Sequence, residues 1–356
     1  MNREKLVSAI RVQRHFIDAS LGLQHAQQLS GFELSEPLLD AVAYNAYIET
    51  IGDKADTIYL RTKAALTEMG TYAYLETIKR LSERFAWKDK NMMLAFDYTD
   101  EEFYGEVQGI DIHGWTGKNG VTGKFKFLTC SIVSDDIPEK IPLCSLPIRM
   151  GHYKSYAITH MLSLVMPYIG SIQLILFDRG FYDKDLMYEL SQNKFPYLIF
   201  VPKYKDKQEI LFPMETGERQ VIIHDFTVNK DKTNYQGETY LAFLKQIYDK
   251  KSGEAYDWVF ATNVEEVALS QIIRTYKKRW RIETGFRVQD EARIKCKSKE
   301  MKIRYFLFLF QQLLQTQWVC FYREEVSFKQ FLIAMHKTCQ DVVANPKRSY
   351  GKSRIA

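Results

Sequence analysis

Two aspartates in this chain directly follow apolar runs that predict buried strands. Asp97 follows MMLAF at residues 92–96, and Asp178 follows IQLILF at residues 172–177. Metal ions and other ligands of α/β sheets collect where such strands end, and carboxylate oxygens are the ligands that Mg²⁺ prefers. An aspartate after a strand can also be a simple turn former or helix cap. The pair therefore makes metal-assisted chemistry at a sheet edge the hypothesis to test.

A third carboxylate lies on a predicted helix. Tyr276, Arg279 and Glu283 are three and four residues apart, so they share one helical face, and Phe286 and Arg287 continue that stripe. The plain interpretation is an Arg279–Glu283 ion pair worth roughly 0.2–0.5 kcal/mol. The functional interpretation adds Glu283 to the two aspartates and places cations one turn away, where they would hold an anionic substrate.

The sequences around these residues resemble a known family. AFDYT, LFDRGFY and YKKRWRIETGF, the last after a β-rich interruption, resemble the DDE transposases of bacterial and archaeal insertion sequences. The closer likeness is to the cut-and-paste branch, whose third carboxylate lies in a Tyr-x2-Arg-x3-Glu-x6-Lys signature, and it spans about residues 92–304. One position departs from the signature, because Asp290 stands where the family has Lys. Arg287 or Arg293, one turn to either side, could supply the missing phosphate contact.

The resemblance implies a DNA transposase that cleaves DNA and transfers the cut strand by a two-metal mechanism. Asp97, Asp178 and Glu283 would be its catalytic residues and would hold two Mg²⁺ ions, which Mn²⁺ can replace. Asp97 would bridge the two ions, with Asp178 on one and Glu283 on the other. The implied partners are the terminal inverted repeats of the element and target DNA, bound by a homodimer. The residues expected to bind DNA are Tyr276, Arg279, Arg281, Arg287, Arg293, Lys295 and Lys297.

Trp258 lies on the last predicted strand of the β-rich interruption. A tryptophan on a strand is ordinarily part of the core. In the resembling family an aromatic residue from this region stabilises a base that is flipped out while a DNA hairpin forms, and an indole ring is suited to stacking on a base. Trp258 is therefore the base-flipping candidate, with a core position as the alternative.

The pattern of elements predicts an α/β fold: a ribonuclease-H-like mixed sheet core with a β-rich insertion, plus helical N-terminal and C-terminal regions. One long helix is expected over about residues 270–287, a strand that ends at Asp97, and an insertion of short strands without helices. The expected divisions are a helical DNA-binding region at 1–88, the first part of the core at 89–202, the β-rich insertion at 203–263, the core helix with the third carboxylate at 264–304, and a helical region with a basic tail at 305–356.

Composition excludes several other classes of protein. The five cysteines are scattered and never form a CxxC pair, so neither a disulfide framework nor a zinc site is indicated. The charged N-terminus lacks the apolar core of a signal peptide. The apolar stretch at residues 305–322 contains four glutamines, which favours a buried helix over a membrane span. A cytoplasmic, nucleoid-associated protein is expected.

The net charge of +5 is unevenly distributed. Residues 274–304 contain twelve Lys and Arg but four Asp and Glu, and residues 346–356 add four more cations without an acid. Such runs are compatible with a solvated helix face or with binding to a phosphate backbone.

Two other functions remain open at this point. A nuclease with the same ribonuclease-H-like core would cut nucleic acid without strand transfer, and a domesticated, non-catalytic protein would bind DNA only. The intact set of three carboxylates argues against the domesticated protein. The glycine-rich residues 117–124 do not match a P-loop, because Phe125 stands where Ser or Thr is needed.

Overall fold

The computed structural model describes most of the chain. The basic tail predicted at residues 346–356 lies outside the described part. The described residues are 1–23, 31–51, 54–135, 137, 140–230, 232–249, 252–266 and 268–344.

The centre of the molecule is one mixed sheet, for which nine strands are found among the described residues. The strand order is β2-β3-β1-β5-β6-β9-β8-β7, with β4 beside β3. β1, β5 and β6 run parallel to one another, and every other pairing is antiparallel. The predicted α/β fold with a ribonuclease-H-like mixed sheet is thereby confirmed. The strands of the first half are β1 (Asn91–Phe103), β2 (His113–Gly114), β3 (Gly123–Ile132), β4 (Pro142–Ile148), β5 (Ser171–Phe177) and β6 (Tyr197–Phe200).

β1 is longer than the sequence pattern indicates. The expectation that the strand ends at Asp97 is wrong, because β1 continues to Phe103, paired with β3 throughout. The acidic second half of β1 looks like a solvated turn in the sequence. It is stabilised as a strand by lysines on β3, since Asp100 forms ion pairs with Lys124 at 3.0 Å and Lys126 at 3.4 Å.

The β-rich interruption extends the core sheet. Its last strand, β9 (Glu254–Thr262), pairs with β6, and β8 (Thr233–Asp249) and β7 (Arg219–Lys230) follow outward. The expectation of short strands without helices is wrong, because β7 and β8 have 12 and 17 residues and α7 (Lys205–Leu211) precedes them. Gly237 suggests a turn but lies within β8, where a Cβ atom would come within 2.6 Å of the Phe226 ring.

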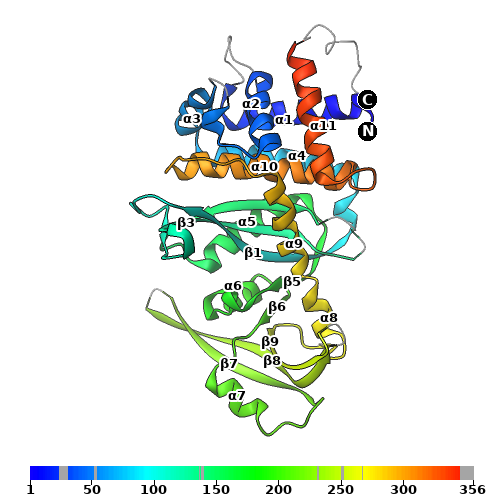
Figure 1. Cartoon of the computed structure of the whole chain (residues 1–356). Coiled ribbons are helices and arrows are strands. Elements are labelled where there is room, and N and C mark those ends of the chain that lie inside the picture. Colours follow the sequence, from blue (N-terminus) through cyan, green and yellow to red (C-terminus); the bar gives the residue numbers. More distant parts are fainter. Residues whose placement is uncertain are drawn as a thin grey trace.

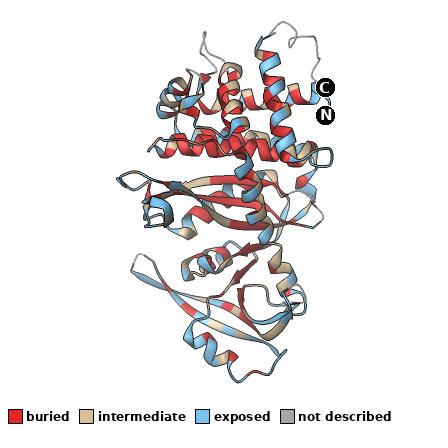
Figure 2. Cartoon of the chain, viewed as in Figure 1, coloured by how far each residue is buried: buried red, intermediate tan, exposed pale blue. Residues whose placement is uncertain are grey.

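Helices form a layer above the sheet in Figure 1. α10 (Met301–Phe321) lies between the other helices of this layer and the sheet, and it is buried along almost its whole length (Figure 2). Its glutamines bind polar groups of its neighbours: Gln312 contacts Ser145, and Gln315 donates to the Gly285 carbonyl. The predicted buried helix is therefore confirmed. The other helices of the layer are α1 (Arg3–Ser20), α2 (Gly31–Tyr44), α3 (Ala55–Ala64), α4 (Thr67–Arg84) and α11 (Phe328–Ala344).

In the described part of the chain, no helix is both long enough and apolar enough to cross a membrane.

Four further helices pack on the sheet itself. α5 (Lys154–Val165) connects β4 to β5, and α6 (Lys184–Gln192) connects the parallel strands β5 and β6. The single helix expected near Glu283 is two helices, α8 (Ile272–Lys277) and α9 (Trp280–Gln289). At their junction the backbone amides of Lys278 and Arg279 donate to carbonyls three residues back, as in a 3₁₀ turn. The junction keeps Tyr276 and Arg279 close together.

Candidate active site

Asp97 and Asp178 lie side by side on neighbouring parallel strands. The last register pair between β1 and β5 is Phe96 with Phe177, so the next residue of each chain segment is an aspartate. Asp178 follows the end of β5, and its Oδ1 accepts a hydrogen bond from the Gly180 amide at 2.9 Å. Asp178 is thus also a helix cap, as the alternative interpretation predicted, and it still lies beside Asp97.

Arg279 connects two of the three carboxylates. Its Nη1 donates to Asp97 Oδ2 at 3.0 Å and its Nη2 donates to Glu283 Oε1 at 2.6 Å. Its Nε donates to the Tyr276 hydroxyl at 3.3 Å. The Arg279 side chain is 6% exposed, against 50% for Glu283. The local ion pair expected on the helix exists, but the same guanidinium also reaches a strand 182 residues away in sequence.

Burial and charge shift the protonation of this cluster. The pKa of Asp97 is raised to about 6: burial is the main cause, Arg279 and the Tyr98 amide oppose it, and the negative charges of Asp178 and Glu283 add to it. Burial disfavours the charged form of Arg279, but Tyr276, Glu283 and Asp97 outweigh it and raise the pKa of the guanidinium above its ordinary value. The charges of both Asp178 and Glu283 thus act on Asp97, which indicates a single electrostatic site.

An open cavity of about 390 Å³ lies beside the carboxylates. Asp178 and Glu283 line it together with Arg279 and Tyr276. Its other lining residues are Arg179, Phe200, Lys203, Tyr256, Asp257, Trp258 and Trp280. We call this cavity the catalytic pocket. Its wall combines acidic, basic and aromatic groups, which suits a substrate with both phosphates and bases.

Trp258 belongs to an aromatic cluster in the wall of this pocket. Its ring centroid lies 5.5 Å from Phe200, 5.8 Å from Phe260 and 6.3 Å from Tyr276. Phe260 is fully buried, whereas Trp258 is partly exposed. The ring thus packs on the core and also lines the pocket, and its role in base flipping stays a prediction.

Among the pocket residues without a role assigned from the sequence, three can be traced to signals in the chain. Arg179 directly follows Asp178 in the LFDRGFY motif, and Trp280 lies within the YKKRWRIETGF motif. The two motifs could therefore have identified both residues. Lys203 follows β6, the strand beside β5, and the general rule that ligands gather where parallel strands end could have identified it.

Arg281 faces away from the catalytic pocket and holds the loop after β3. It donates to the carbonyls of Val133 and Ser134, both at 2.9 Å, and to Asp135 at 2.6 Å. Asp135 also pairs with Lys278 at 2.7 Å. These contacts occupy the guanidinium internally, and they give Arg281 a structural role in place of the predicted contact with DNA.

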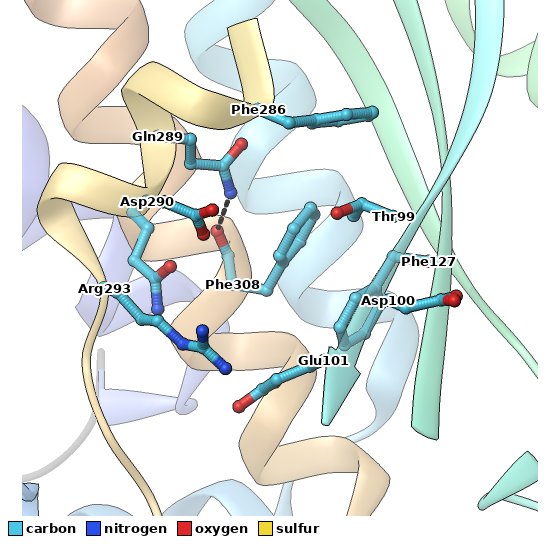
Figure 3. A pocket seen from close by; sticks show the side chains of 10 residues that line it. Thr99, Asp100, Glu101, Phe127, Phe286, Gln289, Asp290, Arg293 and Phe308 are labelled. Atoms are coloured by element: carbon cyan, nitrogen blue, oxygen red, sulfur yellow. Dashed lines mark hydrogen bonds between the residues drawn. The ribbon is translucent and has the colours of Figure 1, made fainter. Parts of the chain in front are cut away.

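The remaining predicted DNA-binding residues lie outside the catalytic pocket. Arg287 is exposed on α9, and its contact with the Thr284 hydroxyl is 3.5 Å long. Arg293 and Asp290 line a second, small pocket of about 30 Å³ between β1, α9 and α10, shown in Figure 3. Burial raises the pKa of Asp290, and Arg293 opposes that shift. Lys295 and Lys297 follow in the segment that leads to α10.

The carboxylates fit a hard divalent cation in chemical type. All three are oxygen donors of the kind that Mg²⁺ takes. Within the described residues, no three His, Cys, Asp or Glu side chains converge closely enough to hold a metal ion as they stand. Arg279 lies between two of the carboxylates, so metal binding there requires the guanidinium to move.

Comparison with known proteins gives one family match. Residues 148–312, somewhat less than half of the chain, match a family model described as transposase DDE domain. That range includes Asp178 and Glu283 but begins after Asp97. The match is to a transposase domain, which is the class of enzyme expected from the sequence. No curated protein matches the chain.

A solved structure shares the fold. The piggyBac transposase, determined in a synaptic complex with hairpin DNA, has a TM-score of 0.59 and 11% sequence identity. The match covers 98% of this chain and 80% of that one. At this identity the likeness concerns the fold, and it extends beyond the family match to β1 and the helical layer.

Proposed function

We propose that this chain is the transposase of an insertion sequence and that Asp97, Asp178 and Glu283 are its catalytic carboxylates. The observation that carries the proposal is the meeting of three distant segments: β1 and β5 place two aspartates side by side, and Arg279 links the first of them to Glu283. All of the residues that form this arrangement belong to the three sequence motifs.

The carboxylates would hold two Mg²⁺ ions, which would activate the attacking oxygen and neutralise charge that develops on the phosphate. The chain itself would bind and orient the DNA. Arg179 and Lys203 line the catalytic pocket on the side of Asp178 and would bind phosphates there. Arg279, released from the carboxylates, has a planar fork that suits a phosphate, and Tyr276 would orient it.

The partners would be the terminal inverted repeats of the element and a target DNA, held by a homodimer. Trp258 and Trp280, both in the wall of the catalytic pocket, offer rings on which an unpaired base can stack. A hairpin intermediate would place such a base there. Trp258 is the better candidate, because its neighbours hold its ring on a strand.

The test uses a plasmid that carries the reading frame with its natural flanking DNA. Purified wild-type protein with Mg²⁺ should release the element and join it to a target plasmid. Asp97→Asn, Asp178→Asn and Glu283→Gln should each abolish cleavage and leave binding in gel shifts largely unchanged, because they remove metal ligands and no cation.

Each alternative predicts a different result. Cleavage without joined products would indicate the nuclease, and binding without cleavage by the wild-type protein would indicate the domesticated DNA-binding protein. Near wild-type cleavage by any one variant would remove that residue from the catalytic set.

A further inference from the structure

Ten of the twelve cations of residues 274–304 fall into two structural groups, and Arg274 and Arg287 belong to neither. Half of the twelve are committed to internal contacts: Lys277, Lys278, Arg279, Arg281, Lys302 and Arg304. Arg293, Lys295, Lys297 and Lys299 form no ion pair with any described residue. The unpaired group occupies every second position of one short segment.

This segment is extended and firmly held. The Lys295 amide donates to the Ala46 carbonyl at 3.2 Å, and the Ile48 amide donates to the Lys295 carbonyl at 3.1 Å. The Lys297 amide donates to Glu49 at 2.8 Å. Ile294 and Cys296 are buried between the cations. Because side chains alternate along an extended chain, the cations share the outward side, with successive members roughly 6.5 Å apart.

Tyr47 supports the middle of the segment. Its ring is 41% exposed and lies 6.0 Å from the Lys295 ammonium and 5.3 Å from that of Lys297. Both ammonium groups therefore contact the Tyr47 ring, which restricts the two lysines before any ligand binds. The nearby acid Glu49 is occupied by the Lys297 amide and the Tyr59 hydroxyl. Glu300, at the end of the segment, lies 3.8 Å from Lys63.

The segment continues from the catalytic helix. α9 carries Glu283, and the chain passes from the end of α9 through the extended segment to the start of α10 (Figure 1). At about 1.5 Å per helical residue and 3.3 Å per extended residue, Lys299 lies up to roughly 35 Å from Glu283 along the chain. That length corresponds to about ten base pairs at 3.4 Å each.

We propose that Lys295, Lys297 and Lys299 form a phosphate track for the DNA backbone, about five to ten base pairs from the bond that is cut, with Arg293 at the end nearest α9. This inference rests on the proposed function and adds to it where the DNA runs after it leaves the catalytic pocket. The helical layer contributes through Tyr47 and the 46–49 backbone, which hold the track in place.

The experiment compares two triple variants with the same change in charge. Lys295→Gln, Lys297→Gln and Lys299→Gln together remove the track, while Lys194→Gln, Lys329→Gln and Lys337→Gln remove three exposed lysines, of α11 and of the turn after α6. DNA affinity is measured from low to moderate salt on a long duplex and on one truncated about five base pairs beyond the cleavage site. Melting temperature checks folding.

On the long duplex the track variant should flatten the slope of log affinity against log salt by about 0.9 for each lost contact, and the control should not. On the truncated duplex the track variant should match the wild type. Tyr47→Ala should weaken binding to the long duplex without changing the slope, because it keeps every charge.

Equal slopes for the track variant and the wild type on the long duplex would overturn the track, and so would an equal loss in the control. Either result would leave metal-dependent cleavage intact. Failure of the wild type to cleave with Mg²⁺ would instead count against the proposed function.

Discussion

Burial of the Asp97 carboxyl makes its ionised form unfavourable. Its side chain is 14% exposed, and burial raises its pKa to about 6, with Asp178 and Glu283 adding to the shift and Arg279 opposing it. Because the folded-state pKa is raised, the contribution to stability is present below the unfolded pKa and is lost as pH rises through about 6. At neutral pH the metal-free site therefore reduces the free energy of unfolding.

Asp97→Asn should accordingly stabilise the protein in EDTA at pH 7.5, by up to about 3 kcal/mol, because the amide is neutral and keeps the shape of the carboxyl. At pH 4 the variant and wild type should melt at nearly the same temperature. Thermal melts across this pH range measure the difference. Added Mg²⁺ should raise the melting temperature of the wild type only; an Asp97→Asn variant that is destabilised at pH 7.5 would contradict the electrostatic account.

Aromatic neighbours hold the Trp258 ring in place, and the ring also lines the catalytic pocket. Trp258→Ala should accumulate nicked DNA and slow hairpin closure, since stacking on a flipped base is worth roughly 1–3 kcal/mol, or about a five- to hundred-fold change in rate. Trp258→Phe should recover part of the loss. End-labelled DNA on denaturing gels separates the two products.

The matched control is Phe260→Leu, a change in the buried neighbour. It should lower the melting temperature and reduce nicking and hairpin formation equally. If Trp258→Ala behaves in the same way, its ring serves only the core.

At the scale of elements, Arg281 fastens the loop after β3 to α9. Arg281→Ala should cost roughly 1–3 kcal/mol of stability, because the carbonyls of Val133 and Ser134 lose their donor. The salt dependence of DNA binding should not change. Arg287→Ala, on the exposed side of the same helix, should flatten that dependence by roughly 0.9. A comparable flattening in Arg281→Ala would restore it to the DNA-binding group.

Sequence patterns identified the helices and strands of the site more accurately than the residues at which these elements begin and end. Apolar runs located β1 and β5, and helical spacing correctly grouped Arg279 with Glu283. The end of β1 was not predictable from local pattern, since Asp100 is held in a strand by lysines of β3. Arg281 donates to the Val133 carbonyl, in a loop almost 150 residues away in sequence. Residue spacing along one helix cannot predict such a long-range contact.

At the scale of the whole molecule, the first helices share their core with the last ones. Phe16 of α1 stacks on Phe306 of α10 at 5.9 Å, and the Tyr74 hydroxyl of α4 bonds to Thr316 at 3.0 Å. We expect calorimetry to show one transition, with the van't Hoff enthalpy close to the calorimetric enthalpy. A chain that begins after residue 88 should fail to fold. Two separate transitions, or a stable and active truncated chain, would show that residues 1–88 are an independent domain.

The place of α10 between the helices and the sheet also has a consequence for synthesis. α1 leaves the ribosome roughly 280 residues before α10 is made, which takes about 15–60 s at roughly 5–20 residues per second. During that time the apolar faces of α1 and α4 lack the helix that covers them, and Glu283 is absent until almost the same moment. A nascent chain is therefore exposed to chaperones and proteases while it is still unable to cut DNA. The third carboxylate and the helix that covers α1 and α4 are synthesised at almost the same time. Protease treatment of ribosome-stalled chains should show α1 becoming resistant only once α10 has emerged, and earlier resistance would contradict this order.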